Sequence, residues 1–87
     1  MATRVLLAED DRATRESLTR ALELDGYDVE AVADGAAALD AFTDETPDVV
    51  VLDLMMPNVD GLTVCRRLRA RSHHTPILIA TARTEVS

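Results

Sequence analysis

Short apolar runs alternate with helical patterns along this sequence, and the alternation limits what the chain can fold into more than any other feature does. The apolar runs cover residues 4–9, 27–33, 48–54 and 76–82. Strands that alternate with helices of about a dozen residues are typical of βαβ units, in which neighbouring strands are parallel. The order β-α-β-α-β-α-β therefore predicts an α/β domain with a doubly wound parallel sheet.

The three predicted helices are marked by Asp-Gly pairs and by apolar residues at helical spacing. The first begins near Asp11 or Arg12 and ends before Gly26, the second follows residues 34–35, and the third follows residues 60–61. The positions that we expect these helices to bury against the sheet are Leu18, Ala21, Leu22, Leu39, Phe42, Leu62, Cys65 and Leu68.

The strands differ in their patterns of apolar residues. The run at 27–33 alternates apolar with acidic residues, which is typical of a strand near the edge of a sheet. The runs at 49–52 and 77–79 are continuously apolar, as expected of strands covered on both faces. At 87 residues and without a recognisable linker, residues 1–87 are predicted to form a single small domain.

The charge balance excludes one class of ligand. A formal net charge of -7 argues against direct binding of nucleic acid, because contact with a phosphate backbone depends on a cationic surface. A cation is the more natural ligand. All nine basic residues are arginines, so the chain contains no lysine. No apolar run approaches the length of a membrane span or signal peptide, and we expect a cytoplasmic protein without membrane contact.

Asp53 is the most unusual residue of the chain, because the stretch "VVVLDLMMPNVDG" otherwise has the pattern of a buried strand. An isolated charged carboxylate in an apolar interior is costly unless it is paired or reached by water. Ligands of parallel sheets bind beyond the carboxyl ends of the strands, and Glu9, Asp10 and Thr81 also lie at predicted strand ends. If the first and third strands are neighbours, several carboxylates converge, and a hard cation such as Mg²⁺ would neutralise them.

Such a site permits phosphoryl transfer, since a metal with open positions can also hold a phosphoryl group. Asp53 would be the nucleophile, Thr81 would donate its hydroxyl to a phosphoryl oxygen, and a main-chain carbonyl near Met55 would complete the metal shell. Two alternatives stay open. Asp11, taken alone, is better explained as a helix N-cap than as a site residue, and the acidic cluster is also consistent with a simple divalent-cation binder.

Taken together, these residues resemble the receiver domain of two-component response regulators, and most closely those joined to winged-helix DNA-binding domains, the OmpR/PhoB-like type. The resemblance runs through "RVLLAEDD", "DGYDVEAVADGAAAL", "PDVVVLDLMMPNVDGL" and "TPILIATAR", which is essentially the whole chain. It implies the flavodoxin-like, CheY-like form of the doubly wound sheet.

The resemblance also implies roles for individual residues. By it, Asp53 is the phosphoacceptor, and Asp10 and Asp53 bind Mg²⁺ directly. The Met55 carbonyl is the third direct ligand, Glu9 acts through water, and Thr81 is the hydroxyl that follows phosphorylation. A sensor histidine kinase is the implied phosphodonor. The only chemistry would be phosphorylation and dephosphorylation of the domain itself, so it is not an enzyme with a separate substrate.

Receivers of this type continue through a fourth helix, a fifth strand whose lysine pairs with the phosphoryl group, and a fifth helix. The present sequence stops before all three. We therefore expect the fourth strand, "ILIA", to be an exposed edge through which the chain self-associates. The alternative function is a receiver fragment with a vestigial acidic site that acts as an oligomerisation or interaction module.

Overall fold

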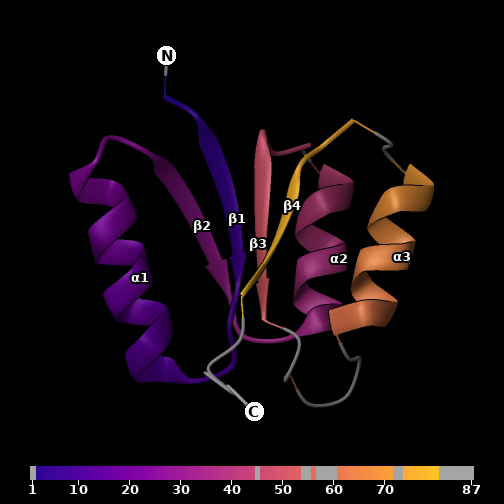
Figure 1. Ribbon diagram of the computed structural model, residues 1–87, viewed down its shortest axis with the longest axis horizontal. Coiled ribbons are helices and arrows are strands. Elements are labelled where there is room, and N and C mark those ends of the chain that lie inside the picture. The colour runs from indigo at the N-terminus through magenta and orange to yellow at the C-terminus, as the bar shows by residue number, and fades with distance from the viewer. Residues whose placement is uncertain (1, 45, 54–55, 57–60, 72–73, 81–87) are drawn as a thin grey trace, which may run out of the picture.

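The structure, a computed structural model, describes residues 2–44, 46–53, 56, 61–71 and 74–80. Within these residues, strands and helices alternate strictly (Figure 1). The elements are β1 (Arg4–Ala8), α1 (Arg12–Leu24), β2 (Asp28–Val32), α2 (Gly35–Asp44), β3 (Val49–Asp53), α3 (Gly61–Arg71) and β4 (Ile77–Ala80). The element order predicted from the apolar runs is confirmed.

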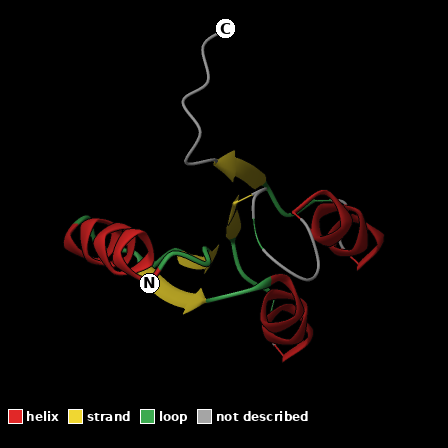
Figure 2. Ribbon diagram, turned by 90° about the horizontal axis from the view of Figure 1, so that it is seen from below, coloured by secondary structure: helices red, strands yellow, loops and turns green. Residues whose placement is uncertain are grey.

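The sheet has the strand order β2-β1-β3-β4, and all neighbouring strands are parallel. The chain moves outward from β1 to β2 and then returns past β1 to form β3. This reversal places α1 on one face of the sheet and both α2 and α3 on the other (Figure 2). The doubly wound parallel sheet is confirmed, and so is the edge position of β2.

The main core lies between the sheet and the helices α2 and α3. Alternate residues of a strand point to the same face, so one set of side chains from β1 and β3 meets both helices. The buried members of this core are Leu6, Ala8, Ala38, Leu39, Phe42, Val50, Leu52, Met56, Val64 and Leu68. Because this core clamps β1 beside β3, it also determines which strand ends lie next to each other.

Helix α3 buries a different face from the one that the sequence predicts. Leu68 is 1% exposed and Cys65 is half-buried, but Leu62 is 57% exposed, so the prediction for Leu62 is wrong. The buried face instead contains Gly61 and Val64. Residues at i, i+3 and i+7 share one side of a helix, and Leu62 lies far around the helix from that side.

Helix α1 begins and ends as predicted, with Asp11 as its N-cap, and the chain reverses at Gly26, whose φ is 93°. Leu18 and Leu22 are half-buried, whereas Ala21 is exposed, so its predicted burial is wrong. Among the described elements, α1 is the only helix on its face of the sheet (Figure 2). Its apolar stripe is therefore covered on one side only.

Strand β4 is less covered than its apolar sequence predicts. Leu78 is 58% exposed and Ile79 is 47% exposed, because no described element packs on the outer side of β4.

Within the described part of the chain, every helix is too short or too polar to span a bilayer.

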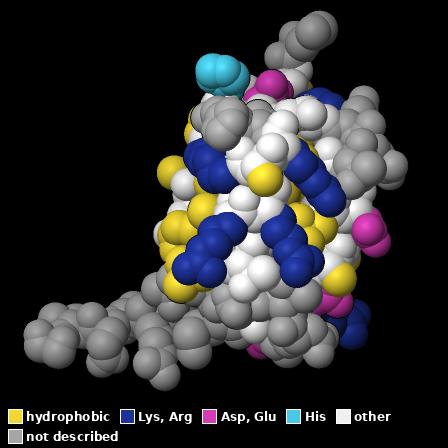
Figure 3. Space-filling view, turned by 90° about the vertical axis from the view of Figure 1, so that its right-hand side faces the viewer, with side chains coloured by type: hydrophobic (Ala, Val, Ile, Leu, Met, Phe, Trp, Pro, Cys, Tyr) yellow, Lys and Arg dark blue, Asp and Glu magenta, His cyan; other side chains and the backbone are white. Residues whose placement is uncertain are grey.

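Arginine side chains cover the outer face of α3 (Figure 3). Arg66 and Arg67 are exposed, whereas Arg69 and Arg71 donate hydrogen bonds to the carbonyl oxygens of Thr75, at 2.6 Å, and Leu39, at 2.9 Å. Cations in the last turn of a helix are also favoured by its dipole. These contacts give two of the α3 arginines a structural role.

The two α3 leucines give a test of this packing. We expect Leu68→Ala to lower the free energy of unfolding by about 2–5 kcal/mol, because it leaves a cavity in the core. The matched change Leu62→Ala, on the exposed side of the same helix, should cost less than about 1 kcal/mol. Urea unfolding of both variants measures the difference. Equal losses would contradict the assigned α3 face.

Candidate metal centre

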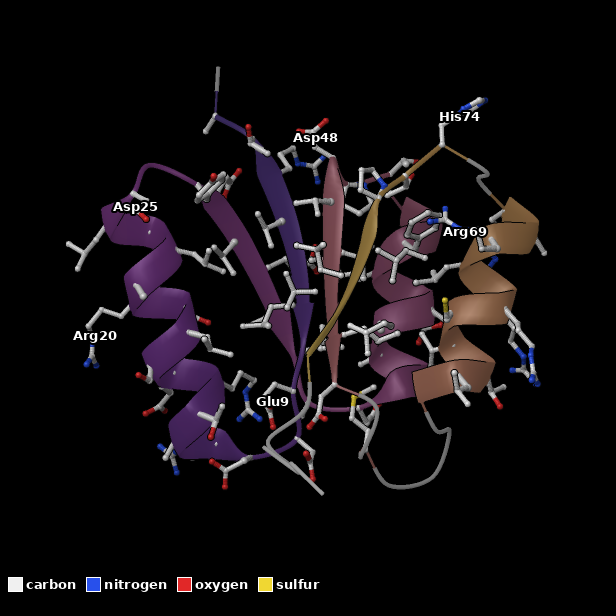
Figure 4. All side chains as sticks on the ribbon, viewed as in Figure 1. Glu9, Arg20, Asp25, Asp48, Arg69 and His74 are labelled. Carbon is white, nitrogen blue, oxygen red and sulfur yellow. The ribbon has the colours of Figure 1, made fainter. Side chains whose placement is uncertain are left out.

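The site lies where β1 and β3 end side by side. The register pairs Ala8 with Leu52, so the next residues, Glu9 and Asp53, lie at the same end of adjacent strands. Figure 4 shows Glu9 at this end of the sheet. The sequence predicted that the acids converge if the first and third strands are neighbours. The pairing of β1 with β3 meets this condition. This is also the point where the strand order reverses, and ligands of open α/β sheets bind at such points.

Three carboxylates converge at this end of the sheet. Glu9, Asp10 and Asp53 each offer an oxygen, and these three atoms lie within 4.8 Å of one another. Glu9 is 5% exposed and Asp53 is 3% exposed, whereas Asp10 is exposed and leaves the site open on one side. An all-oxygen set of this size fits a hard cation such as Mg²⁺, which takes one or two carboxylates and keeps other positions for water or phosphate.

Two predicted site residues lie outside the described residues. These are Met55, predicted to offer its carbonyl to the metal, and Thr81, predicted to donate its hydroxyl to a phosphoryl group. Their roles remain predictions. The three carboxylates are the part of the predicted site that the structure brings together.

The carboxyl groups of the cluster repel one another when they are charged. Burial raises the pKa of the Glu9 carboxyl above its ordinary value, and the nearby carboxyl groups of Asp53 and Asp10 raise it further. The Asp11 N–H opposes this shift by donating a hydrogen bond of 3.0 Å to Glu9 Oε2. The charged form of the Glu9 carboxyl is thus disfavoured relative to an exposed glutamate, and a cation in the site would offset that cost.

Asp11 stands apart from the cluster, and its interpretation as an N-cap is confirmed. Its carboxylate accepts hydrogen bonds from the Thr14 backbone N–H, at 2.8 Å, and from Thr14 Oγ1, at 2.7 Å. These bonds lower the pKa of Asp11, the side-chain bond contributing most. An exposed cap of this kind orients the start of α1 directly after the two acids.

Sequence reasoning missed one residue next to the site. Arg15 Nη1 donates hydrogen bonds to the backbone carbonyl oxygens of Glu9, at 3.0 Å, and Asp10, at 3.3 Å. The only sequence signal is an arginine near the start of a helix that begins shortly after Glu9 and Asp10. That pattern does not predict contact with backbone carbonyls.

The sheet is parallel, its strand order reverses between β1 and β3, and acidic residues lie at the carboxyl ends of these two strands. Comparison with known proteins shows which family has this architecture. The profile of the response regulator receiver domain matches residues 5–87. The chain therefore belongs to the response regulator receiver domain family, whose members are phosphoacceptors in two-component signalling.

Curated relatives include response regulators MprA from mycobacteria. The protein of Mycobacterium sp. (strain KMS) is 54% identical over 87 residues, and that of Mycobacterium tuberculosis (strain ATCC 25177 / H37Ra) is 53% identical. In each case the alignment covers 100% of this chain but 38% of the relative. The chain thus spans well under half the length of these relatives.

Solved structures share the fold over nearly the whole chain. The chemotaxis response regulator CheY4 of Vibrio cholerae matches with a TM-score of 0.91 and 31% identity, covering 98% of this chain and 72% of that one. Response regulator TrrA of Thermotoga maritima, in complex with Mg²⁺-BeF, matches with a TM-score of 0.90 and 32% identity, covering 94% and 71%.

Replacement of Glu9 tests the electrostatics of the site. In chelator at roughly pH 7.5, Glu9→Gln should raise the unfolding midpoint by a few degrees, because it removes a buried charge and keeps an oxygen for the Asp11 N–H. A raised pKa stabilises the fold at low pH, and this stabilisation is lost as pH rises through it. The gain should therefore vanish near roughly pH 4, where Glu9 is itself protonated.

The control for this measurement is Glu23→Gln, a change to an exposed acid on α1, which should leave the midpoint unchanged at both pH values. Thermal unfolding followed by circular dichroism gives both midpoints. A lower midpoint for Glu9→Gln than for the parent near neutral pH would contradict the claim that the charged Glu9 carboxylate destabilises the fold.

Proposed function

We propose that Asp53 is the phosphoacceptor of this receiver domain and that Mg²⁺ is its cofactor. The observation that carries the proposal is the buried Asp53 carboxylate held beside Glu9 and Asp10 at the reversal point of the sheet. A carboxylate held close to two others is suited to binding a cation, which neutralises the charge, and then to accepting a phosphoryl group. By contrast, an N-cap or a solvated acid needs no such neighbours.

Asp10 and Asp53 would hold the metal directly, and Glu9 would act through water. Bound Mg²⁺ would supply positive charge that offsets the carboxylates and the oxygens of an incoming phosphoryl group. Met55, through its carbonyl, and Thr81, through its hydroxyl, are proposed as the remaining metal and phosphoryl contacts. The Thermotoga maritima relative was solved in complex with Mg²⁺-BeF, which supports Mg²⁺ as the cofactor.

The phosphodonor we propose is a sensor histidine kinase, and the location is the cytoplasm. An oxygen of the Asp53 carboxylate attacks the phosphorus atom, the bond from phosphorus to the donor's imidazole nitrogen breaks, and its electron pair stays on the imidazole. The products are an aspartyl phosphate and a free histidine. The domain would thus act on no separate substrate, and its role would be regulatory.

Exposure of β4 favours a second property, self-association through that strand. Leu78 and Ile79 are both about half-exposed, and within the described residues β4 is the outer strand of the sheet. Exposed apolar edge strands are ready partners for a second chain. The family match and the converged acids favour phosphoryl uptake as the main function over the interaction module with a vestigial site.

Intact mass tests the phosphoacceptor. After incubation with acetyl phosphate and Mg²⁺, we expect the parent to gain the mass of one phosphoryl group, and to gain none when chelator replaces Mg²⁺. Asp53→Asn should abolish the gain. The matched control is Asp48→Asn, directly before the first residue of the same strand, where the carboxylate accepts a hydrogen bond of 2.8 Å from the Arg4 backbone N–H. It should leave uptake intact, and uptake by Asp53→Asn equal to the parent's would refute the assignment.

Self-association has its own test. Analytical ultracentrifugation across a range of concentrations should show the parent forming dimers or larger species. Leu78→Glu should shift it towards monomer, because a charge on the exposed face of β4 opposes edge pairing. The control is Leu24→Glu, a change to another exposed leucine at the end of α1, which should leave the association unchanged. A parent that stays monomeric at high concentration would exclude self-association.

A further inference from the structure

We infer that Arg15 is a positioning residue for the metal centre, one that holds the backbone of Glu9 and Asp10 so that their carboxylates face Asp53. The inference rests on the proposed function, because it assumes that the acidic cluster binds a divalent cation. It goes beyond that function by assigning a role to a residue that offers no ligand atom of its own.

The first support is the pair of contacts that Arg15 makes. One guanidinium nitrogen, Nη1, reaches the carbonyl oxygens of two consecutive residues, Glu9 at 3.0 Å and Asp10 at 3.3 Å. Hydrogen bonds with a charged donor are stronger than those between neutral groups. A single side chain therefore ties together the backbone of two proposed metal-site residues.

The second support is the anchoring of Arg15 itself. Its backbone N–H donates to the Asp11 carbonyl at 2.8 Å, and its carbonyl accepts from Thr19 Oγ1 at 2.7 Å. The residue is half-buried in α1, whose start is held by the Asp11 cap. The guanidinium is thus attached to a rigid element, which is what a positioning residue requires.

Asp10 is the residue that most needs such support. Glu9 is buried, and its carboxylate accepts the Asp11 N–H at 3.0 Å. Asp10 is exposed, and among the described residues no hydrogen bond to its carboxylate is found. Repulsion from Glu9 and Asp53 favours movement of Asp10 outward into water. The contact of Arg15 with the Asp10 carbonyl restrains the backbone against that movement.

Charge alone predicts the opposite effect on the metal. A guanidinium beside a cation site repels the cation, so removing Arg15 would tighten Mg²⁺ binding if its charge were all that mattered. Nor does Arg15 form a salt bridge with any described residue, in contrast to Arg12, which pairs with Glu16 at 3.1 Å. Positioning and charge effects therefore differ in sign, and a binding measurement separates them.

The experiment compares the Mg²⁺ affinity of the parent, Arg15→Gln and Arg12→Gln by isothermal titration calorimetry. We expect Arg15→Gln to bind Mg²⁺ about tenfold more weakly, the size of effect typical of groups that orient metal ligands. Arg12→Gln removes the same charge from the exposed side of the same helix and makes no contact with the Glu9 or Asp10 carbonyls. Its affinity should stay within about twofold of the parent's, because exposed charges are screened by salt.

A third variant, Arg15→Lys, keeps the charge but lacks the planar fork of the guanidinium, so it should also bind Mg²⁺ more weakly than the parent. Thermal unfolding in chelator shows which variants are folded. If Arg15→Gln is unfolded, Arg15→Lys decides: weaker binding supports positioning, and unchanged binding overturns it.

The remaining outcomes separate this inference from the proposed function. Binding by Arg15→Gln that equals or exceeds the parent's, or equal weakening by Arg12→Gln, would overturn the positioning role and leave the metal centre standing. A folded parent that binds no Mg²⁺ would overturn the proposed cofactor and the role of Arg15 together.

Discussion

Mutual repulsion among three carboxylates is the constraint on which the rest of this structure depends. Glu9, Asp10 and Asp53 present oxygens within 4.8 Å of one another, and two of the three side chains are buried. Like charges at that distance are tolerated only if one is protonated or a cation lies among them. Burial, together with the neighbouring carboxyl groups, raises the pKa of Glu9, which is the electrostatic cost of holding its charge there. The Mg²⁺ that we propose as cofactor would relieve the repulsion in the second way.

The fold holds the acids together through packing rather than through contacts between them. Parallel pairing of β1 with β3 sets Glu9 beside Asp53, and the aliphatic core under α2 and α3 keeps the two strands in register. The Asp11 cap starts α1 immediately after Asp10, and Arg15 reaches back from that helix to the carbonyls of the acidic turn. The repulsion among the three carboxylates is thus opposed in two ways. Apolar side chains are buried away from the site, and a few hydrogen bonds with charged groups form near it.

Much of this was predictable from sequence, because it depends on strand order. Alternating apolar runs predict parallel strands, and parallel strands bring acids at their carboxyl ends to one edge of the sheet. The side of α3 that is buried was not predictable in the same way: Leu62 is as apolar as Leu68, and only the packed sheet decides which of them it covers. The contact of Arg15 depends on where two backbone carbonyls point, and no pattern of residue types records that. The roles of Met55 and Thr81 remain predictions, since both residues lie outside those that the structure describes.

The most direct test of the central claim is a crystal structure of this chain grown with Mg²⁺ and beryllium fluoride, the combination present in the Thermotoga maritima relative. We expect a metal ion bound by Asp10 and Asp53, with the beryllium atom bonded to an oxygen of Asp53. An ordered cluster of the three acids without either ligand, or with the beryllium bonded to a different residue, would contradict the proposal that these carboxylates exist to accept a phosphoryl group.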